Sequence, residues 1–338
     1  MRKSLFLAAA VAVAMASGSA SAQTGASFAR KTITIYIANT AGGSYDLYAR
    51  LIARNFGKHL PGTPTVVASN MPGGGGLICA NYLYTVAPKD GTALGVLIET
   101  VAVEQALKDP GVRYDAAKFN WVGRVASSNN VHFQWHSSKV QSLEDAKKME
   151  TTVAGTGPGN MAEIMPKVLN AVVGTKFKII SGYPASTEAM LAMEKGEVEG
   201  GLSAWATLKV QKQDWLRDKT IKIILQDVPD RSPELADVPA LGEIGSTQEE
   251  KGVLGIYASN GVIGRSLVAP PGLPPDVVAA LRTGFDAMVK DAAFIAEIDK
   301  LKVELDPYTG QQLQERAVKL LDVPDSVRRR AMAIFGRT

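Results

Sequence analysis

The chain is poor in the residues that most enzymes and metal sites depend on, with one cysteine and three histidines among 338 residues. The lone thiol, Cys79, has no partner for an internal disulfide, so we expect it to pack as a small apolar residue. His132 and His136 have the spacing of a metal-binding pair on a helix. The segment 131–135 is predicted as a strand, which would place the two side chains ~13 Å apart. No metal site is therefore expected.

Long apolar runs and an excess of charge of one sign are also missing from the body of the protein. Beyond the N-terminal region, no window approaches the ~18 uninterrupted apolar residues that a membrane-spanning helix needs. The formal net charge is +4, and the longest basic run is Arg328–Arg330. This near balance gives no electrostatic basis for binding nucleic acid, and no nucleic-acid partner is expected.

The N-terminal region has the composition of an export signal. Arg2 and Lys3 precede an apolar run from Leu5 to Met15, which is followed by small residues ending in Ala22. This pattern predicts a secretory signal peptide over residues 1–22, cleaved near Ala22. The remaining chain is long enough for two lobes with separate cores. Export also removes the usual supply of nucleotide cofactors, so no cofactor is expected.

Along the mature chain, short β-branched runs alternate with longer segments of helical character. This alternation is typical of parallel strands joined by crossover helices, which predicts an α/β fold. Strands are expected at 32–39, 65–68, 93–98, 131–135, 151–154, 176–180, 198–202 and 221–226, and helices at 45–60, 77–86, 162–173, 187–195, 275–290 and 310–321.

Two glycine-rich turns each connect a predicted strand to a predicted helix. The first turn covers 41–44 and the second covers 155–160. Glycine lets the backbone turn tightly and lets a ligand approach, and the free N–H groups at a helix start favour an anion. Two such turns, about 110 residues apart, suggest two lobes that close on one small acid.

Residues 70–76, Asn-Met-Pro-Gly-Gly-Gly-Gly, resemble the Asn-x-Pro-Gly-x-Gly-Gly turn of a known family, the extracytoplasmic solute receptors of tripartite tricarboxylate transporters. Further blocks keep the family's order and cover nearly the whole mature chain. These blocks are Gly42–Asp46 with Ala49-Arg50, Ala87–Thr92, Gly196–Glu199, Arg231–Pro239 and Ala269–Pro274.

The resemblance implies a two-lobed periplasmic binding protein of the type II-like, Venus-flytrap architecture. Each lobe would be a mostly parallel sheet flanked by helices, with the ligand cleft between the lobes. Lobe 1 would comprise 23–130 plus 226–338, and lobe 2 would comprise 131–225. The implied protein is not an enzyme. It is a monomer that captures a small organic carboxylate (a di- or tricarboxylate or an aromatic acid) and delivers it to the large and small integral membrane subunits of a secondary transporter.

The resemblance also implies that backbone amides of the glycine turns hold the ligand. The N–H groups of Gly43–Tyr45 are expected to meet one carboxylate. Asp46 either caps the helix start or contacts the ligand, and Tyr45 either borders the pocket or lies exposed on the turn. The expected ligand-binding residues are Gly42, Gly43, Ser44, Tyr45, Asp46, Thr100, Thr156, Gly157, Pro158, Gly159, Asn160, Tyr183, Ser203, Ala204 and Trp205.

Two positions depart from the family pattern. Glu99 stands where the family commonly has serine or threonine, and an ionised glutamate facing the cleft would repel a carboxylate. Pro184 follows Tyr183 where lysine or arginine is common. Arginine is the obvious anchor for a carboxylate, but Arg50 and Arg54 lie one and two turns into the first helix and are expected to face solvent or a structural acid.

The sequence raises three alternatives to a receptor. Residues 157–162 fit a Gly-x-Gly-x-x-Ala dinucleotide pattern, but no acid follows about 20 residues later to bind a ribose. A secreted hydrolase acting through Ser44 or Ser203 is an alternative, although 42–46 lacks the second glycine of a nucleophile elbow. The third reading is a ligand sensor for a signalling partner.

Overall fold

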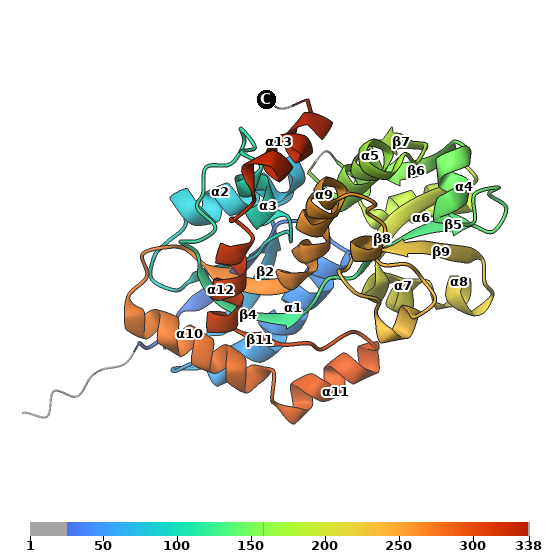
Figure 1. The fold of residues 1–338 in the computed structure, drawn as a ribbon. Helices are drawn as coiled ribbons and strands as arrows, with labels where there is room; N and C mark the ends of the chain where they lie inside the picture. The colour runs from blue at the N-terminus through green and yellow to red at the C-terminus, as the bar shows by residue number, and fades with distance from the viewer. Residues whose placement is uncertain (1–25, 158, 337–338) are drawn as a thin grey trace, which may run out of the picture.

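The computed structural model describes residues 26–157 and 159–336. The predicted signal peptide and Pro158 lie outside these residues. Within them the strands form two separate sheets, of six and five strands, each covered by its own helices. Figure 1 shows the second sheet with helices α4, α5 and α6, in green and yellow, beside the half built on the first sheet. The predicted α/β fold with two sheets flanked by helices is confirmed.

The first sheet has the strand order β11-β4-β10-β3-β1-β2. Strand β1 pairs in parallel with β2 and β3, whereas β10 pairs antiparallel with β3 and β4, and β11 pairs antiparallel with β4. Four strands therefore run in one direction and two run against them. The bounds are β1 Thr32–Ile37, β2 Thr65–Asn70, β3 Ala93–Val96, β4 Asn120–Ala126, β10 Arg265–Ala269 and β11 Tyr308–Thr309.

The second sheet has the order β7-β6-β8-β5-β9. Strand β6 pairs in parallel with β7 and β8, and β5 runs antiparallel to both β8 and β9. The sheet is therefore mostly unidirectional. The bounds are β5 Asn130–Trp135, β6 Thr151–Gly155, β7 Phe177–Ser181, β8 Gly200–Ala204 and β9 Ile221–Gln226.

Helices cover the sheets in two groups. Helices α1, α2, α10 and α12 pack on strands of the first sheet, and α5, α6 and α7 pack on strands of the second. The bounds are α1 Ser44–Phe56, α2 Leu77–Thr85, α3 Val101–Ala106, α4 Leu143–Lys148, α5 Met161–Val173, α6 Ser186–Glu194, α7 Trp205–Gln211, α8 Gln213–Arg217, α9 Gln248–Ala258, α10 Pro275–Met288, α11 Ala292–Leu301, α12 Gly310–Lys319 and α13 Asp325–Ile334, with short 3₁₀ turns at Gly57–His59, Gly74–Gly76, Pro233–Leu235, Leu241–Glu243 and Ser259–Val262.

The chain passes between the two halves more than once. It leaves the first sheet after β4 and enters β5 of the second sheet, and it returns to the first sheet at β10. Helices α9 and α13 pack against α5, which covers the second sheet, although both follow β9 in the chain. The division into lobe 1 (23–130 plus 226–338) and lobe 2 (131–225) stays a proposal. Helices α9 and α13 belong to lobe 1 in this division but pack against α5 of lobe 2.

Strands β4, β10 and β11 and helices α3, α4, α7, α8, α9, α11 and α13 lie outside the predicted set. Strands β4 and β10 are almost wholly buried, yet each contains an arginine, Arg124 within β4 and Arg265 at the first position of β10. Arg124 in β4 is satisfied by the carbonyl oxygens of Val262 and Asp306 and by the Asp306 carboxylate. These partners lie far away in the sequence. A prediction from neighbouring residues alone therefore places such an arginine on the surface.

The core contains Cys79, which is fully buried as expected, and burial raises the pKa of its thiol to about 12. This thiol is inert at neutral pH, because the thiolate is the reactive form. Over the part of the chain that the structure describes, no helix is both long enough and apolar enough to cross a bilayer.

Candidate ligand-binding site

A cleft opens between the two sheets, and both halves contribute to its walls. The empty space in it is about 640 Å³, including the part open to solvent. The cavity volume that compares with those of known small-molecule sites is about 70 Å³, below the ~300–1,000 Å³ of drug-sized pockets, so this conformation of the cleft suits only a small solute. The cleft is lined by Asn39, Thr40, Gly43, Ser44, Tyr45, Ile98, Glu99, Asn130, Thr156, Asn160, Met161, Pro184, Ala185, Ser186, Leu202, Ala204, Thr207 and Arg265.

Three helices of eight or more residues begin at this cleft. They are α1, α5 and α6, and residues at the start of each line the cleft. Asn160 caps α5 by accepting from the Ala162 N–H, whereas in the described chain no side chain caps α1 or α6. The uncapped N–H groups and the helix dipoles make the cleft favourable for an anion.

The first glycine turn is held by Asp46. Its carboxylate accepts hydrogen bonds from the Gly42 N–H (3.1 Å), the Arg50 Nε (3.0 Å) and the Asn70 Nδ2 (3.0 Å). Burial opposes ionisation of Asp46, but these hydrogen bonds outweigh it and lower the pKa of the carboxyl group. Gly42 and Asp46 thus shape the turn from behind, while Gly43, Ser44 and Tyr45 line the cleft.

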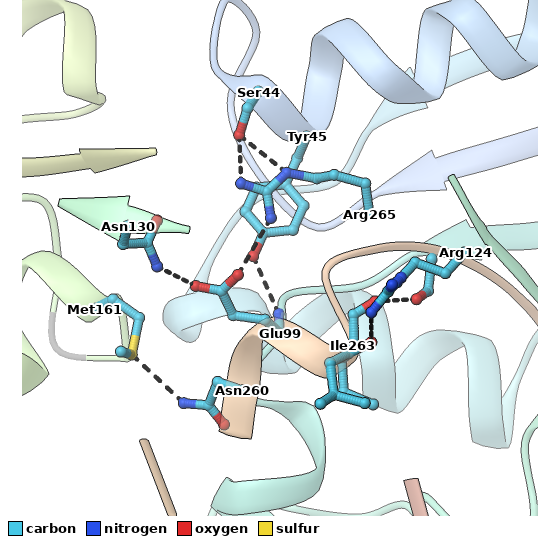
Figure 2. Close-up of polar contacts among 11 residues, drawn as sticks. Ser44, Tyr45, Glu99, Arg124, Asn130, Met161, Asn260, Ile263 and Arg265 are labelled. Atoms are coloured by element: carbon cyan, nitrogen blue, oxygen red, sulfur yellow. Dashed lines mark hydrogen bonds and ion pairs between the residues drawn. The ribbon is translucent and has the colours of Figure 1, made fainter. Parts of the chain in front are cut away.

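A buried polar network forms one wall of the cleft, and Figure 2 shows its members pointing toward one another. Arg265 Nη1 lies 3.1 Å from Glu99 Oε2, and both side chains are 3% exposed. Arg265 also donates from Nε (3.0 Å) and Nη2 (2.7 Å) to Ser44 Oγ. Glu99 Oε1 accepts from Asn130 Nδ2 at 2.5 Å, so the network joins the end of β3 to the start of β5 in the other sheet.

Tyr45 completes this wall. Its ring lies under the Arg265 guanidinium at 4.1 Å, and its hydroxyl oxygen accepts from the Glu99 N–H at 3.1 Å. Burial is the main reason that its pKa is raised well above the usual value. The side chain is 7% exposed, so it borders the cleft as a neutral, fixed aromatic surface.

In the second half, Thr156, Asn160 and Ala204 line the cleft. The Gly157 N–H donates to Glu163 Oε1 at 3.0 Å, which fixes the turn. Gly159 lies against the other half: a Cβ built on it would come within 2.7 Å of the Gly75 Cα.

Eight of the expected contacts that the structure describes are not part of the cleft lining: Gly42, Asp46, Gly157 and Gly159, which lie in the two turns, and Thr100, Tyr183, Ser203 and Trp205. Thr100 is buried at the start of α3, and Ser203 is buried in β8 opposite Val131. The Tyr183 N–H donates to the Gly155 oxygen, and the Trp205 indole donates to Glu234.

Arg265 is the charged residue of the described cleft lining that the sequence did not single out. The local signal was a single basic residue in the otherwise uncharged run 261–269. That signal is weak, because the function of Arg265 depends on the antiparallel pairing of β10 with β3, which brings it to Glu99 across 166 residues of sequence.

The site does not resemble a hydrolase. Ser44 Oγ accepts two hydrogen bonds from Arg265, and no histidine is among the described residues that line the cleft. A nucleophilic serine needs a neighbouring base, and Ser44 has a cation beside it instead. Among residues 26–157 and 159–336 no cluster of three or more His, Cys, Asp or Glu side chains is placed to hold a metal ion.

Two α/β sheets with a chain that passes between them, and a polar cleft where helix starts converge, define a two-lobed solute-binding protein of the periplasmic type. The chain belongs to the tripartite tricarboxylate transporter family of receptors, whose family model matches residues 48–331. The predicted family and fold are thereby confirmed.

Individual relatives agree with this assignment. The chain is 26% identical over 301 residues to a UPF0065 protein in the gbd 5' region of Cupriavidus necator, covering 86% of this chain and 85% of that one. It is similar in fold to R. palustris Rpa4515 with adipate (TM-score 0.68, 20% identity, covering 89% of this chain and 97% of that one). MatC from Rhodopseudomonas palustris with bound malate gives a TM-score of 0.64 at 20% identity, over 86% and 98% of the two chains.

Proposed function

We propose that this receptor captures a small organic carboxylate in the cleft and delivers it to the large and small membrane subunits of a tripartite tricarboxylate-type transporter. The observation that carries the proposal is the convergence of the α1, α5 and α6 starts on one cleft that also contains Arg265. Acids held by two structural neighbours, adipate and malate, support the same ligand chemistry.

The proposed binding mode uses both halves. One carboxylate meets the N–H groups of Gly43–Tyr45 and the hydroxyl of Ser44. The other end of the ligand meets Thr156, Asn160 and the uncapped start of α6 at Ala185–Ser186. Of the remaining predicted site residues, Ala204 adds cleft wall, and Gly42, Asp46, Thr100, Gly157, Gly159, Tyr183, Ser203 and Trp205 act by shaping the loops.

The proposed location is the periplasm, reached after cleavage of the signal peptide near Ala22. In this location the protein acts as a monomer and leaves its ligand chemically unchanged. The lobes close when the ligand binds, and they open to release it to the transporter.

The test is a thermal-shift screen of the mature protein against mono-, di-, tri- and keto-carboxylates and aromatic acids, with analysis of every acid after incubation. Ligand at ~100 times its Kd stabilises the native state by ~2.7 kcal/mol. A shift with a few related acids, recovered intact, supports a receptor. Consumption of an acid contradicts it and favours the hydrolase, and no shift across the panel contradicts carboxylate binding.

Delivery is tested separately, by uptake of the identified acid into vesicles containing the two membrane subunits. Uptake that requires the added receptor supports the proposal. Uptake that is the same without the receptor contradicts delivery and favours the sensor.

A further inference from the structure

The side chains that line the cleft carry no net charge. In the described part of the chain the lining contains one acid, Glu99, and one base, Arg265, and these two are in direct contact. The only net attraction for an anion therefore comes from helix starts and polar groups. Such a cleft is built for less negative charge than one lined by unpaired arginines.

Ser44 links Arg265 to the ligand position through hydrogen bonds. Its oxygen accepts two N–H bonds from Arg265, which occupies the acceptor positions of a hydroxyl. The Ser44 hydroxyl proton is then free to donate, and the residue lines the cleft at the start of α1. One carboxylate bound there is a single hydrogen bond away from the guanidinium.

Glu99 restricts which functional groups the ligand can have beside its bound carboxylate. Each of its carboxylate oxygens already accepts one bond, from Asn130 and from Arg265, and each retains a second acceptor position. A hydroxyl or ammonium group of the ligand would satisfy such a position. At an effective dielectric constant of about 20, Glu99 alone would weaken the binding of a second carboxylate about 5 Å away by roughly two- to three-hundredfold, and the neighbouring Arg265 guanidinium offsets part of this repulsion.

We propose that the Glu99–Arg265 pair makes this receptor selective for an acid with a single carboxylate and a neighbouring hydrogen-bond donor, a 2-hydroxy or 2-amino acid, over di- and tricarboxylates. This inference rests on the proposed function, because it assigns the ligand class of the same cleft. Glu99 thus acts as a specificity residue that sets the number of negative charges the cleft accepts.

The experiment compares acids of equal carbon number, from four to eight carbons and with aromatic members: the plain monocarboxylate, its 2-hydroxy and 2-amino forms, and the dicarboxylate. Affinities are measured by calorimetry for the wild-type protein, Glu99→Gln and the control Glu144→Gln, whose carboxylate pairs with Lys147 on the exposed helix α4. The double variant E99Q/R265Q removes both charges and serves if E99Q alone fails to fold.

We expect the wild-type protein and E144Q to bind a 2-hydroxy or 2-amino acid at least tenfold tighter than the matched dicarboxylate. In E99Q, the ratio of the affinity for the 2-hydroxy or 2-amino acid to that for the dicarboxylate falls by roughly a hundredfold. In E99Q/R265Q the preference for the 2-hydroxy or 2-amino acid is weaker, but the dicarboxylate is not favoured. Tightest binding of a dicarboxylate by the wild-type protein, or an unchanged ratio in E99Q, overturns this inference and leaves the carboxylate receptor standing. Absence of binding by every acid refutes both.

Discussion

The contact between Gly159 and Gly75 offers the sharpest test of closure around the cleft. Gly159 precedes α5 of the second half, and Gly75 lies in the glycine turn before α2 of the first half. A Cβ on Gly159 would lie 2.7 Å from the Gly75 Cα and 3.3 Å from the Gly75 carbonyl oxygen. Gly159→Ala therefore places a methyl group directly against the backbone of the other half.

The magnitude follows from the overlap. Carbon atoms pack at about 3.5–4.0 Å, so the two loops must separate by about 1 Å to accept the methyl group. The opposing atoms are backbone and have no alternative rotamer. Overpacking of this kind costs about 1–3 kcal/mol. Because the cost falls only where the loops meet, the Kd for ligand should rise by roughly 5- to 150-fold.

The assay is calorimetric titration of Gly159→Ala with an acid that the wild-type protein binds, together with small-angle scattering of the ligand-bound protein. We expect weaker binding, a slightly larger radius of gyration and an unchanged circular dichroism spectrum. The matched control is Gly255→Ala in α9, where a Cβ meets no atom within 4 Å. Wild-type affinity in a folded Gly159→Ala protein would refute the reasoning.

Three further predictions concern charged and polar groups. Arg265→Met strands the Glu99 carboxylate in the interior, so we expect a loss of about 3–5 kcal/mol in urea unfolding; the added change Glu99→Met should recover part of it, and no recovery would argue against the pair. The hydrogen bond from Lys58 is the main reason that the pKa of Asp291 is lowered to about 2. Asp291 therefore stabilises the fold above pH ~4 and loses this effect as the pH falls toward 2. The Tm of Asp291→Asn should be lower than that of the wild-type protein at pH 7, and this difference should vanish near pH 2. A difference that stays constant with pH would contradict this account. Ser44→Ala removes the donor beside Arg265 and should weaken acid binding about tenfold in calorimetry, whereas unchanged affinity would exclude contact between the Ser44 hydroxyl and the ligand.

The sequence predicted the elements whose signals are local. Strand β1 with the turn into α1, and β6 with the turn into α5, follow from a β-branched run, glycine residues and helical periodicity within about 20 residues. The same local signals predicted Ser44, Tyr45, Thr156 and Asn160 as site residues, and all four line the cleft.

The elements that escaped prediction depend on distant partners. Strands β4 and β10 contain buried arginines whose charges are balanced by distant acids, Asp306 for Arg124 and Glu99 for Arg265. Glu99 drew attention as a residue that repels a carboxylate. Its neutralisation by Arg265 depends on strand pairing that no local pattern contains.

The packing of α13 has a mechanical consequence. Helix α12 lies on β4 of the first sheet, yet α13, a few residues later, lies on α5 and α9 beside the second. The segment 320–324 therefore ties the two halves together a third time, after the passages at 127–129 and 259–264. Each chain connection removes some of the freedom of one half to twist or slide against the other, and the connection at 320–324 adds a third such restraint. The two halves of this receptor should accordingly open along a single, reproducible trajectory.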